Sequence, residues 1–162
     1  MAKAIVTASL IGKDEIIDLF NQMGPAAQNS VKRVIAEHSL IIASNAKRLC
    51  PVRKAPGGVG GRLRASITPR YYANGLTADV GTNVEYAPFV EFGTGRRGAG
   101  SLPSGTPLPD GYAHGPRAGM GAQPYLFPAF IQQKPKFEAD LKKVVMNSAR
   151  GFKGAATRRG GL

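Results

Sequence analysis

The sequence predicts an α+β fold of one domain, in which a long central helix and a C-terminal helix pack against an antiparallel sheet. Two patterns predict it. Apolar residues recur at three- and four-residue steps in two segments, as on helices, and two short β-type runs flank an Asn-Gly pair, as in hairpins. A chain of 162 residues is long enough to bury one core. We place this domain at residues 1–149 and expect a basic, glycine-rich tail at residues 150–162.

The central helix is indicated by an apolar stripe over residues 31–49. It should end at Cys50-Pro51, because the residue before a proline disfavours the helical conformation. A short amphipathic helix is expected before it, over residues 14–23, where acids open the pattern and Gly24-Pro25 stops it. The last helix should begin at Pro135 or the next residue. Its apolar stripe consists of Phe137, Leu141, Val144 and Val145.

Three strands are expected. Residues 4–11 mix β-branched and apolar types in a short run that a glycine ends. Two further strands, Leu63–Tyr72 and Leu76–Gly81, should form a hairpin through Asn74-Gly75, a pair that accepts the positive φ angles of a tight turn. At the start of the first of these two, apolar residues alternate with arginine and serine, which predicts one apolar face and one basic face.

A long loop is expected at residues 93–122, which contain nine glycines, four prolines and scarcely an aliphatic side chain, too little apolar surface to fold alone. Within it, Gly93–Gly98 spell the dinucleotide-binding fingerprint. That motif requires a strand before it and a helix after it, and residues 101–107, with two prolines, cannot form the helix. We therefore do not expect nucleotide binding.

Charge is the feature that invites a nucleic-acid function, because 22 basic residues against 10 acids give a net charge of +12. Seven basic residues and no acid fall in residues 47–72, and four more basic residues fall in the tail. A solvated surface and a contact with a polyanion are both open interpretations. Base recognition would need interleaved aromatics, of which only Tyr71 and Tyr72 lie nearby. What remains is a sequence-independent phosphate contact or docking on an acidic protein.

No catalytic or metal-binding constellation is found in the sequence. His38 lies on the apolar face of the central helix and should pack there, since no nucleophile or carboxylate motif points to it. His114 is expected to be solvated in the loop, and Cys50 to be a small buried apolar residue. We expect no enzyme, no cofactor and no metal. No apolar run reaches membrane length and the N-terminus lacks a signal sequence, so we expect a soluble, unsecreted protein.

Three stretches of the sequence occur in a recognisable order. They are Cys50–Val52 with Gly61–Ile67, then Val80–Thr94, then Ala122–Ala129. Together they resemble the small tail-component and neck proteins of long-tailed double-stranded DNA bacteriophages, a family that includes tail-completion and minor-tail proteins. The resemblance covers about residues 26–149, although residues 53–60 and the loop are longer than is usual there. The signature residues are Gly81, Tyr86, Glu91, Phe92, Gly93, Thr94, Pro124 and Pro128.

The resemblance implies a non-enzymatic virion structural protein, made in the host cytoplasm and located at the phage neck or tail end. It would complete the tail and join it to the head as part of a homo-oligomeric ring, hexameric by family implication. Its partners would be tail-tube or tail-terminator and head-connector proteins, with transient contact with genomic DNA. The alternative is a basic accessory protein that binds nucleic acid without sequence specificity, for which retention on DNA at low salt discriminates.

Subunit contacts are expected at charged residues of the central stretch, the loop and the tail. Glu91 lies among apolar neighbours and needs a partner, and we expect Arg62 or Arg64. The signature also holds three aromatics at three-residue steps, which should share one side of a helical turn as ordinary core. They are Tyr86, Phe89 and Phe92. The interface candidates are Arg62, Arg64, Glu91, Arg96, Arg97, Arg117, Arg158 and Arg159.

Overall fold

The computed structural model describes the backbone of residues 7–10, 24–52 and 60–158. Side chains are described for residues 24–52 and 60–148. The short helix expected at residues 14–23 lies outside the described residues, as do residues 53–59.

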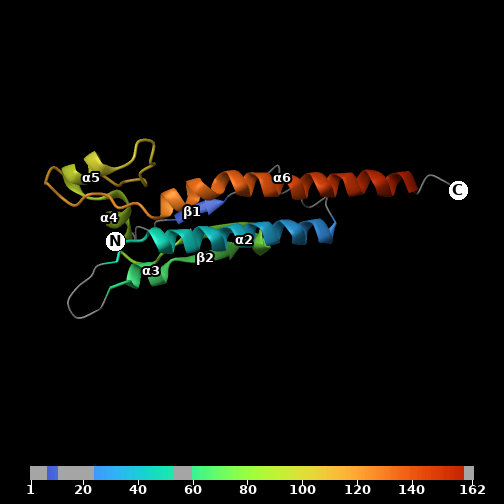
Figure 1. Ribbon diagram of the computed structural model, residues 1–162, viewed down its shortest axis with the longest axis horizontal. Helices are drawn as coiled ribbons and strands as arrows, with labels where there is room; N and C mark the ends of the chain where they lie inside the picture. The colour runs from blue at the N-terminus through green and yellow to red at the C-terminus, as the bar shows by residue number, and fades with distance from the viewer. Residues whose placement is uncertain (1–6, 11–23, 53–59, 159–162) are drawn as a thin grey trace.

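Two layers make up the fold (Figure 1). Strands β1 (Thr7–Leu10), β2 (Thr68–Tyr72) and β3 (Thr77–Gly81) form an antiparallel sheet in the order β1-β3-β2. Helices α2 (Pro25–Leu49) and α6 (Leu126–Arg158) run side by side in opposite directions. Helix α2 packs on β3 and β2, while α6 packs on α2 and contacts β1. The predicted α+β fold is confirmed, as is the end of the central helix at Leu49.

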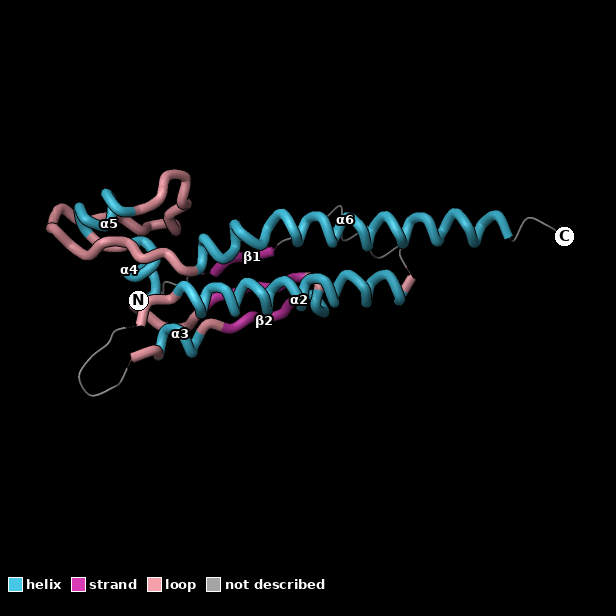
Figure 2. The backbone as a smooth tube through the Cα atoms, viewed as in Figure 1, coloured by secondary structure: helices cyan, strands magenta, loops and turns pink. Residues whose placement is uncertain are grey.

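Three short helices gather at the end of the molecule where α2 ends and α6 begins (Figure 2). They are α3 (Arg62–Ser66), α4 (Ala87–Phe92) and α5 (Gly95–Ser101). At the other end of the sheet, a 3-10 turn at Ala73–Gly75 joins β2 to β3. Asn74 has a φ of 56° and Gly75 a φ of 86°, so the Asn-Gly pair does make the predicted tight turn.

The core lies between the helices and one face of the sheet. Val80 of β3 is fully buried, and its register partners are Ala8 of β1 and Pro69 of β2. Toward the other end of the sheet, Val31, Ile35 and Ala78 form a second buried cluster, against which part of the predicted α6 stripe packs. The stripe residues in that cluster are Phe137, Leu141 and Val144.

The first predicted hairpin strand is wrong over residues 62–66, which form helix α3. The alternating pattern there also places Leu63 and Ile67 one helical turn apart, and both are buried in the main core. Gly61, with a φ of 106°, turns the chain into the helix, and the Ser66 hydroxyl donates to the Leu63 carbonyl at 2.8 Å. The strand is therefore confined to Thr68–Tyr72.

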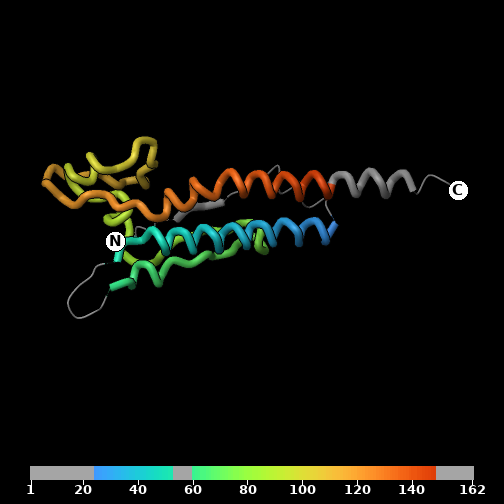
Figure 3. Tube along the Cα trace, in the orientation of Figure 1, coloured from blue at the N-terminus to red at the C-terminus, as the bar shows by residue number. Residues whose placement is uncertain are grey.

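The last helix begins at Leu126, well before the predicted start at Pro135. Pro135 lies inside the helix, where it removes one backbone hydrogen bond without ending the element. The helix also continues to Arg158, through residues assigned above to the tail. In Figure 1 this last part of α6 extends beyond the start of α2. Figure 3 shows α2 and the earlier part of α6 running side by side. The earlier start has a cause remote in sequence, a carboxylate from α4 that is described below.

Residues 93–122, which we call the glycine arm, project from the end of the molecule (Figure 1). The arm was expected to be a loop throughout, and α5 corrects this over Gly95–Ser101. The returning chain lies against the arm's first residues: the Thr94 amide donates to the Met120 carbonyl at 2.8 Å, and the Met120 amide to the Thr94 hydroxyl at 2.9 Å. These contacts order a segment that has few apolar side chains.

Candidate docking site around helix α4

Helix α4 divides the aromatic signature between the interior and the surface. Phe92 is 5% exposed and belongs to the main core. Tyr86 is 44% exposed and Phe89 48% exposed. The prediction of ordinary core is thus confirmed for Phe92 and wrong for the other two aromatics. Helix α4 has six residues, and Glu91 and Phe92 lie on the side of it that is buried.

Glu91 is fully buried and caps the beginning of α6. Its Oε2 accepts the amides of Tyr125 and Leu126 at 2.9 and 3.0 Å, and its Oε1 accepts the Phe127 amide at 2.8 Å. A carboxylate suits a helix N-terminus, where backbone N–H groups lack partners within the helix. Burial raises the pKa of the Glu91 carboxyl, and these three hydrogen bonds oppose that rise.

The expected pairing of Glu91 with an arginine is therefore wrong. Neither Arg62 nor Arg64 lies within ion-pair distance of its carboxylate, and Arg64 instead donates to the Cys50 carbonyl at 3.0 Å. The apolar neighbours of Glu91 in the sequence indicate that its carboxylate needs a partner. They do not indicate which partner, because the three amides follow Glu91 by 34 to 36 residues.

The exposed aromatics of α4 border a hollow of about 620 Å³, which we call the α4 hollow. Tyr86, Phe89 and Met120 are all more than two-fifths exposed and lie on its wall. Among the described residues that line it, Arg62 alone carries a charge. The other lining residues are Pro51, Val52, Gly60, Gly61, Leu63, Val90 and Gln123. The hollow can thus accept an apolar group together with an anionic one.

Two rings of the arm pack behind α4. The Tyr112 ring lies 5.3 Å from Phe92 and 5.6 Å from His114, measured between centroids, and its hydroxyl donates to the Gly93 carbonyl. His114 Nε2 donates to the Phe92 carbonyl at 2.9 Å. His114 was expected to be solvated, and its half-buried place in this stack corrects that expectation.

The dinucleotide-binding fingerprint of the arm matches in residue type and spacing but not in structure. Helix α4, not a strand, precedes it, and helix α5 begins inside it. The amides of Arg96 and Arg97, which would face a pyrophosphate, donate to the carbonyls of Arg117 and Ala118, each at 2.9 Å. The arrangement therefore leaves these two donors occupied by the protein's own backbone.

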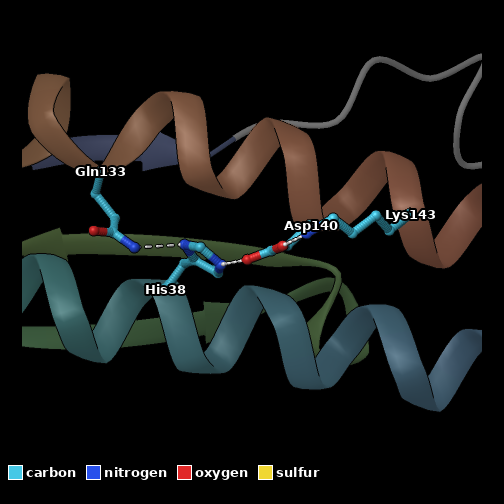
Figure 4. A network of polar contacts seen from close by, with 4 residues as sticks. All are labelled: His38, Gln133, Asp140 and Lys143. Carbon is cyan, nitrogen blue, oxygen red and sulfur yellow. Dashed lines mark hydrogen bonds and ion pairs between the residues drawn. The ribbon is translucent and has the colours of Figure 1, made fainter.

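His38 packs between α2 and α6, as predicted, and is 4% exposed. Gln133 donates to its Nδ1 at 2.8 Å, so the ring proton resides on Nε2, which faces Asp140 Oδ2 at 3.3 Å (Figure 4). Lys143 donates to the other oxygen of Asp140 at 2.9 Å. That hydrogen bond is the largest cause of the lowered pKa of Asp140. The network joins the two helices and contains no nucleophile.

Cys50 is buried in the main core, as predicted, and burial raises the pKa of its thiol. A thiol held in its protonated form is a poor nucleophile. No group of three or more histidine, cysteine or acidic residues that could hold a metal ion occurs in the part of the chain that the structure describes. A search of the same residues for helices long and apolar enough to span a membrane finds none.

The remaining predicted residues lie apart from one another. Arg62 and Arg64 are exposed on α3, and Arg96, Arg97 and Arg117 are exposed on the arm. Thr94 ties the two ends of the arm together, Pro124 is half-buried just before α6, and Pro128 lies in its first turn. Gly81 ends β3. The side chain of Arg158, and Arg159 altogether, lie outside the described residues.

Met120 lines the hollow but lies outside the stretches that carry the resemblance, whereas Gln123 lies in the third of them. The Gln123 amide donates to the Val90 carbonyl at 2.8 Å, which brings this stretch back to α4 after some thirty residues. No local pattern in a glycine-rich segment signals that return. The exposure of Tyr86 and Phe89 depends on which elements cover α4, because Phe92 of the same short turn is buried.

The comparisons with known proteins give one family. Residues 14–93, just under half of the chain, match the family described as "Bacteriophage HK97-gp10, putative tail-component". The match includes α2, α3, the β2–β3 hairpin and α4, and it ends at the signature glycine Gly93. No curated protein and no solved structure matches the chain. The match confirms the resemblance that the motifs predicted: over residues 14–93 the chain is similar to the HK97-gp10 tail-component family of bacteriophages.

Proposed function

We propose that this protein is a non-enzymatic structural subunit of the virion at the phage neck or tail end. There a ring of its copies, hexameric as the family resemblance implies, would complete the tail and join it to the head. The similarity of residues 14–93 to a phage tail-component family supports a structural role in the virion. The α4 hollow carries the proposal of subunit contact. Tail-tube or tail-terminator and head-connector proteins would be the further partners.

A second copy of the chain is the proposed occupant of the α4 hollow. A closed ring requires two different surfaces on each subunit, and the hollow has the features of one of them. Tyr86, Phe89 and Met120 are large apolar groups around a concave surface, which is typical of the residues that dominate binding energy between proteins. Arg62 at this site favours a neighbour that presents a carboxylate beside its apolar group.

The double variant Tyr86→Ala/Phe89→Ala tests this contact. Each truncation removes an exposed anchor, and we expect the affinity between subunits to fall at least about tenfold for each side chain. Native mass spectrometry of the purified protein, and its abundance in virions purified after complementation, would measure the loss. The thermal unfolding midpoint should change little, because both side chains are about half exposed.

Leu40→Ala/Tyr72→Ala is the matched control. These side chains are 56% and 48% exposed on α2 and β2, away from the hollow, so this variant should assemble like the wild type. A ring that forms normally with the α4 aromatics truncated would contradict the proposed contact. Absence of the wild-type protein from purified virions would contradict the structural function itself.

A further inference from the structure

Three arginines of the glycine arm, Arg96, Arg97 and Arg117, are brought together by the backbone of the arm; we call them the arm arginines. The Arg96 amide donates to the Arg117 carbonyl, and the Arg97 amide to the carbonyl next to it, each at 2.9 Å. All three side chains are exposed. The ion pairs within the described residues lie on α2 and α6, and no carboxylate there lies within 4.0 Å of an arm arginine.

The backbone beneath the arm arginines is closely packed. A Cβ added to Gly93, Gly95, Gly98 or Gly119 would lie less than 3.0 Å from other backbone atoms. Three of these glycines also have φ angles between 58° and 71°, which disfavour any other residue. A charged group on such a backbone loses less conformational freedom on binding than one on a flexible loop.

Two of the arm arginines, Arg96 and Arg97, lie in the first turn of α5, where no acidic residue occurs. Their charges are therefore not offset by an acid of the same turn.

The chemistry of the surrounding surface favours phosphate groups over an acidic protein. Protein interfaces need buried apolar anchors, and Met120, the large exposed apolar residue nearest in sequence to Arg117, lies on the wall of the α4 hollow. Three small residues within three positions of an arm arginine in the sequence, Ala99, Gly100 and Pro116, are exposed. Guanidinium groups bind phosphate oxygens through paired hydrogen bonds, whereas base recognition would need aromatic or amide side chains. Residues 94–99 and 115–119, which contain the arm arginines, include neither kind.

We propose that the arm arginines form a contact site for the phosphate backbone of duplex DNA, independent of base sequence. The site goes beyond the structural role proposed above, since it uses a different surface from the α4 hollow and does not require the ring. It assigns the arm arginines to DNA instead of to a neighbouring subunit.

Binding to a fluorescein-labelled duplex of about 30 base pairs tests the site, with anisotropy measured between about 50 and 300 mM NaCl. The logarithm of the association constant falls by about 0.9 per phosphate neutralised for each logarithmic unit of salt. The variant Arg96→Gln/Arg97→Gln/Arg117→Gln should therefore bind more weakly at about 50 mM salt and show a salt slope shallower by about 2 to 3.

The control is Arg33→Gln/Arg48→Gln/Arg70→Gln, which removes the same number of charges from exposed positions on α2 and β2. Its salt slope should change by less than about 1. Equal losses in the two variants would show that net charge alone is responsible and would overturn the proposal. Absence of DNA binding by the wild type at the lowest salt would overturn it too, as would equal arm-dependent binding of poly-L-glutamate. Ring formation by both variants, measured by native mass spectrometry, separates these outcomes from failure of the proposed structural function.

Discussion

The helical body and the glycine arm of this protein are ordered in different ways. In the body, α2, α6 and the sheet bury apolar side chains such as Val31, Ile42 and Val80, each at most 1% exposed. In the arm, order comes largely from backbone hydrogen bonds and from glycines that allow two chain segments to touch, with Tyr112 packed against Phe92 of the core. Burial tolerates many substitutions of similar volume, whereas close backbone contact tolerates none larger than glycine at the point of contact.

The two regions meet at Glu91. Its carboxylate comes from α4, at the base of the arm, and holds the first amides of α6, the longest helix of the body. The body thus depends on a polar group at the base of the arm, and the arm is anchored where the body begins. We therefore expect a substitution at Glu91 to affect both the body and the arm, whereas a substitution further along the arm should affect the arm alone.

Glu91→Gln should have the largest effect. The amide side chain retains one acceptor oxygen, so at least one of three buried N–H donors loses its partner or faces another donor. We expect the free energy of unfolding to fall by about 2 to 4 kcal/mol, measured by urea denaturation. Glu85→Gln, at an exposed position just before α4, should change it by less than about 0.5 kcal/mol. Equal effects of the two variants would contradict the capping role.

Substitution by alanine at two glycines of α5, Gly98 and Gly100, should change the stability of the arm in opposite directions. A Cβ at Gly98 would meet the Gly93 backbone and the His114 ring at less than 3.0 Å, whereas a Cβ at Gly100 would meet nothing within 4 Å. Gly98→Ala should destabilise the arm by about 1 to 3 kcal/mol, as other overpacked sites do. Gly100→Ala should stabilise it by about 0.5 to 1 kcal/mol, because alanine favours the helix.

Hydrogen exchange at the Thr94, Arg96 and Arg97 amides reports on the arm directly, since each donates to the returning chain. Exchange there should accelerate in Gly98→Ala and slow in Gly100→Ala, with α2 amides unchanged in both. Faster exchange in both variants would show that α5 glycines are needed for flexibility and not for close contact.

The body was easier to predict from the sequence than the arm. Apolar periodicity predicted the central helix and its last residue, because a helix that packs against a sheet carries an apolar stripe and because Pro51 ends this one. The pattern at residues 62–67 fitted both a strand and one helical turn, and packing of Leu63 and Ile67 decided for the helix. The early start of α6 could not be predicted, since it depends on Glu91, far earlier in the chain.

The candidate docking site was predictable in part. The spacing of Tyr86, Phe89 and Phe92 correctly indicated a helical turn, but not that two of the rings would remain exposed, because that depends on which elements cover α4. The composition of the arm predicted an unsupported loop because composition reflects side chains, whereas much of the order of the arm comes from backbone contacts. Glycine spacing in such a segment indicates close approach only when the partner segment is known.

The smallest predicted effect concerns the polar network that joins α2 to α6. The hydrogen bond from Lys143, followed by lesser contributions that include His38, lowers the pKa of Asp140 below 3.8. A carboxyl with a lowered pKa in the folded state stabilises the protein above its ordinary pKa, and this stabilisation is lost as the pH falls through the folded value. Asp140→Asn should therefore lower the thermal midpoint slightly at about pH 7 and by progressively less toward about pH 3. Glu138→Gln removes one charge from the same helix and controls for net charge. A difference for Asp140→Asn that persists unchanged at the acidic end of this range would show that the carboxylate's charge plays no part in joining the helices.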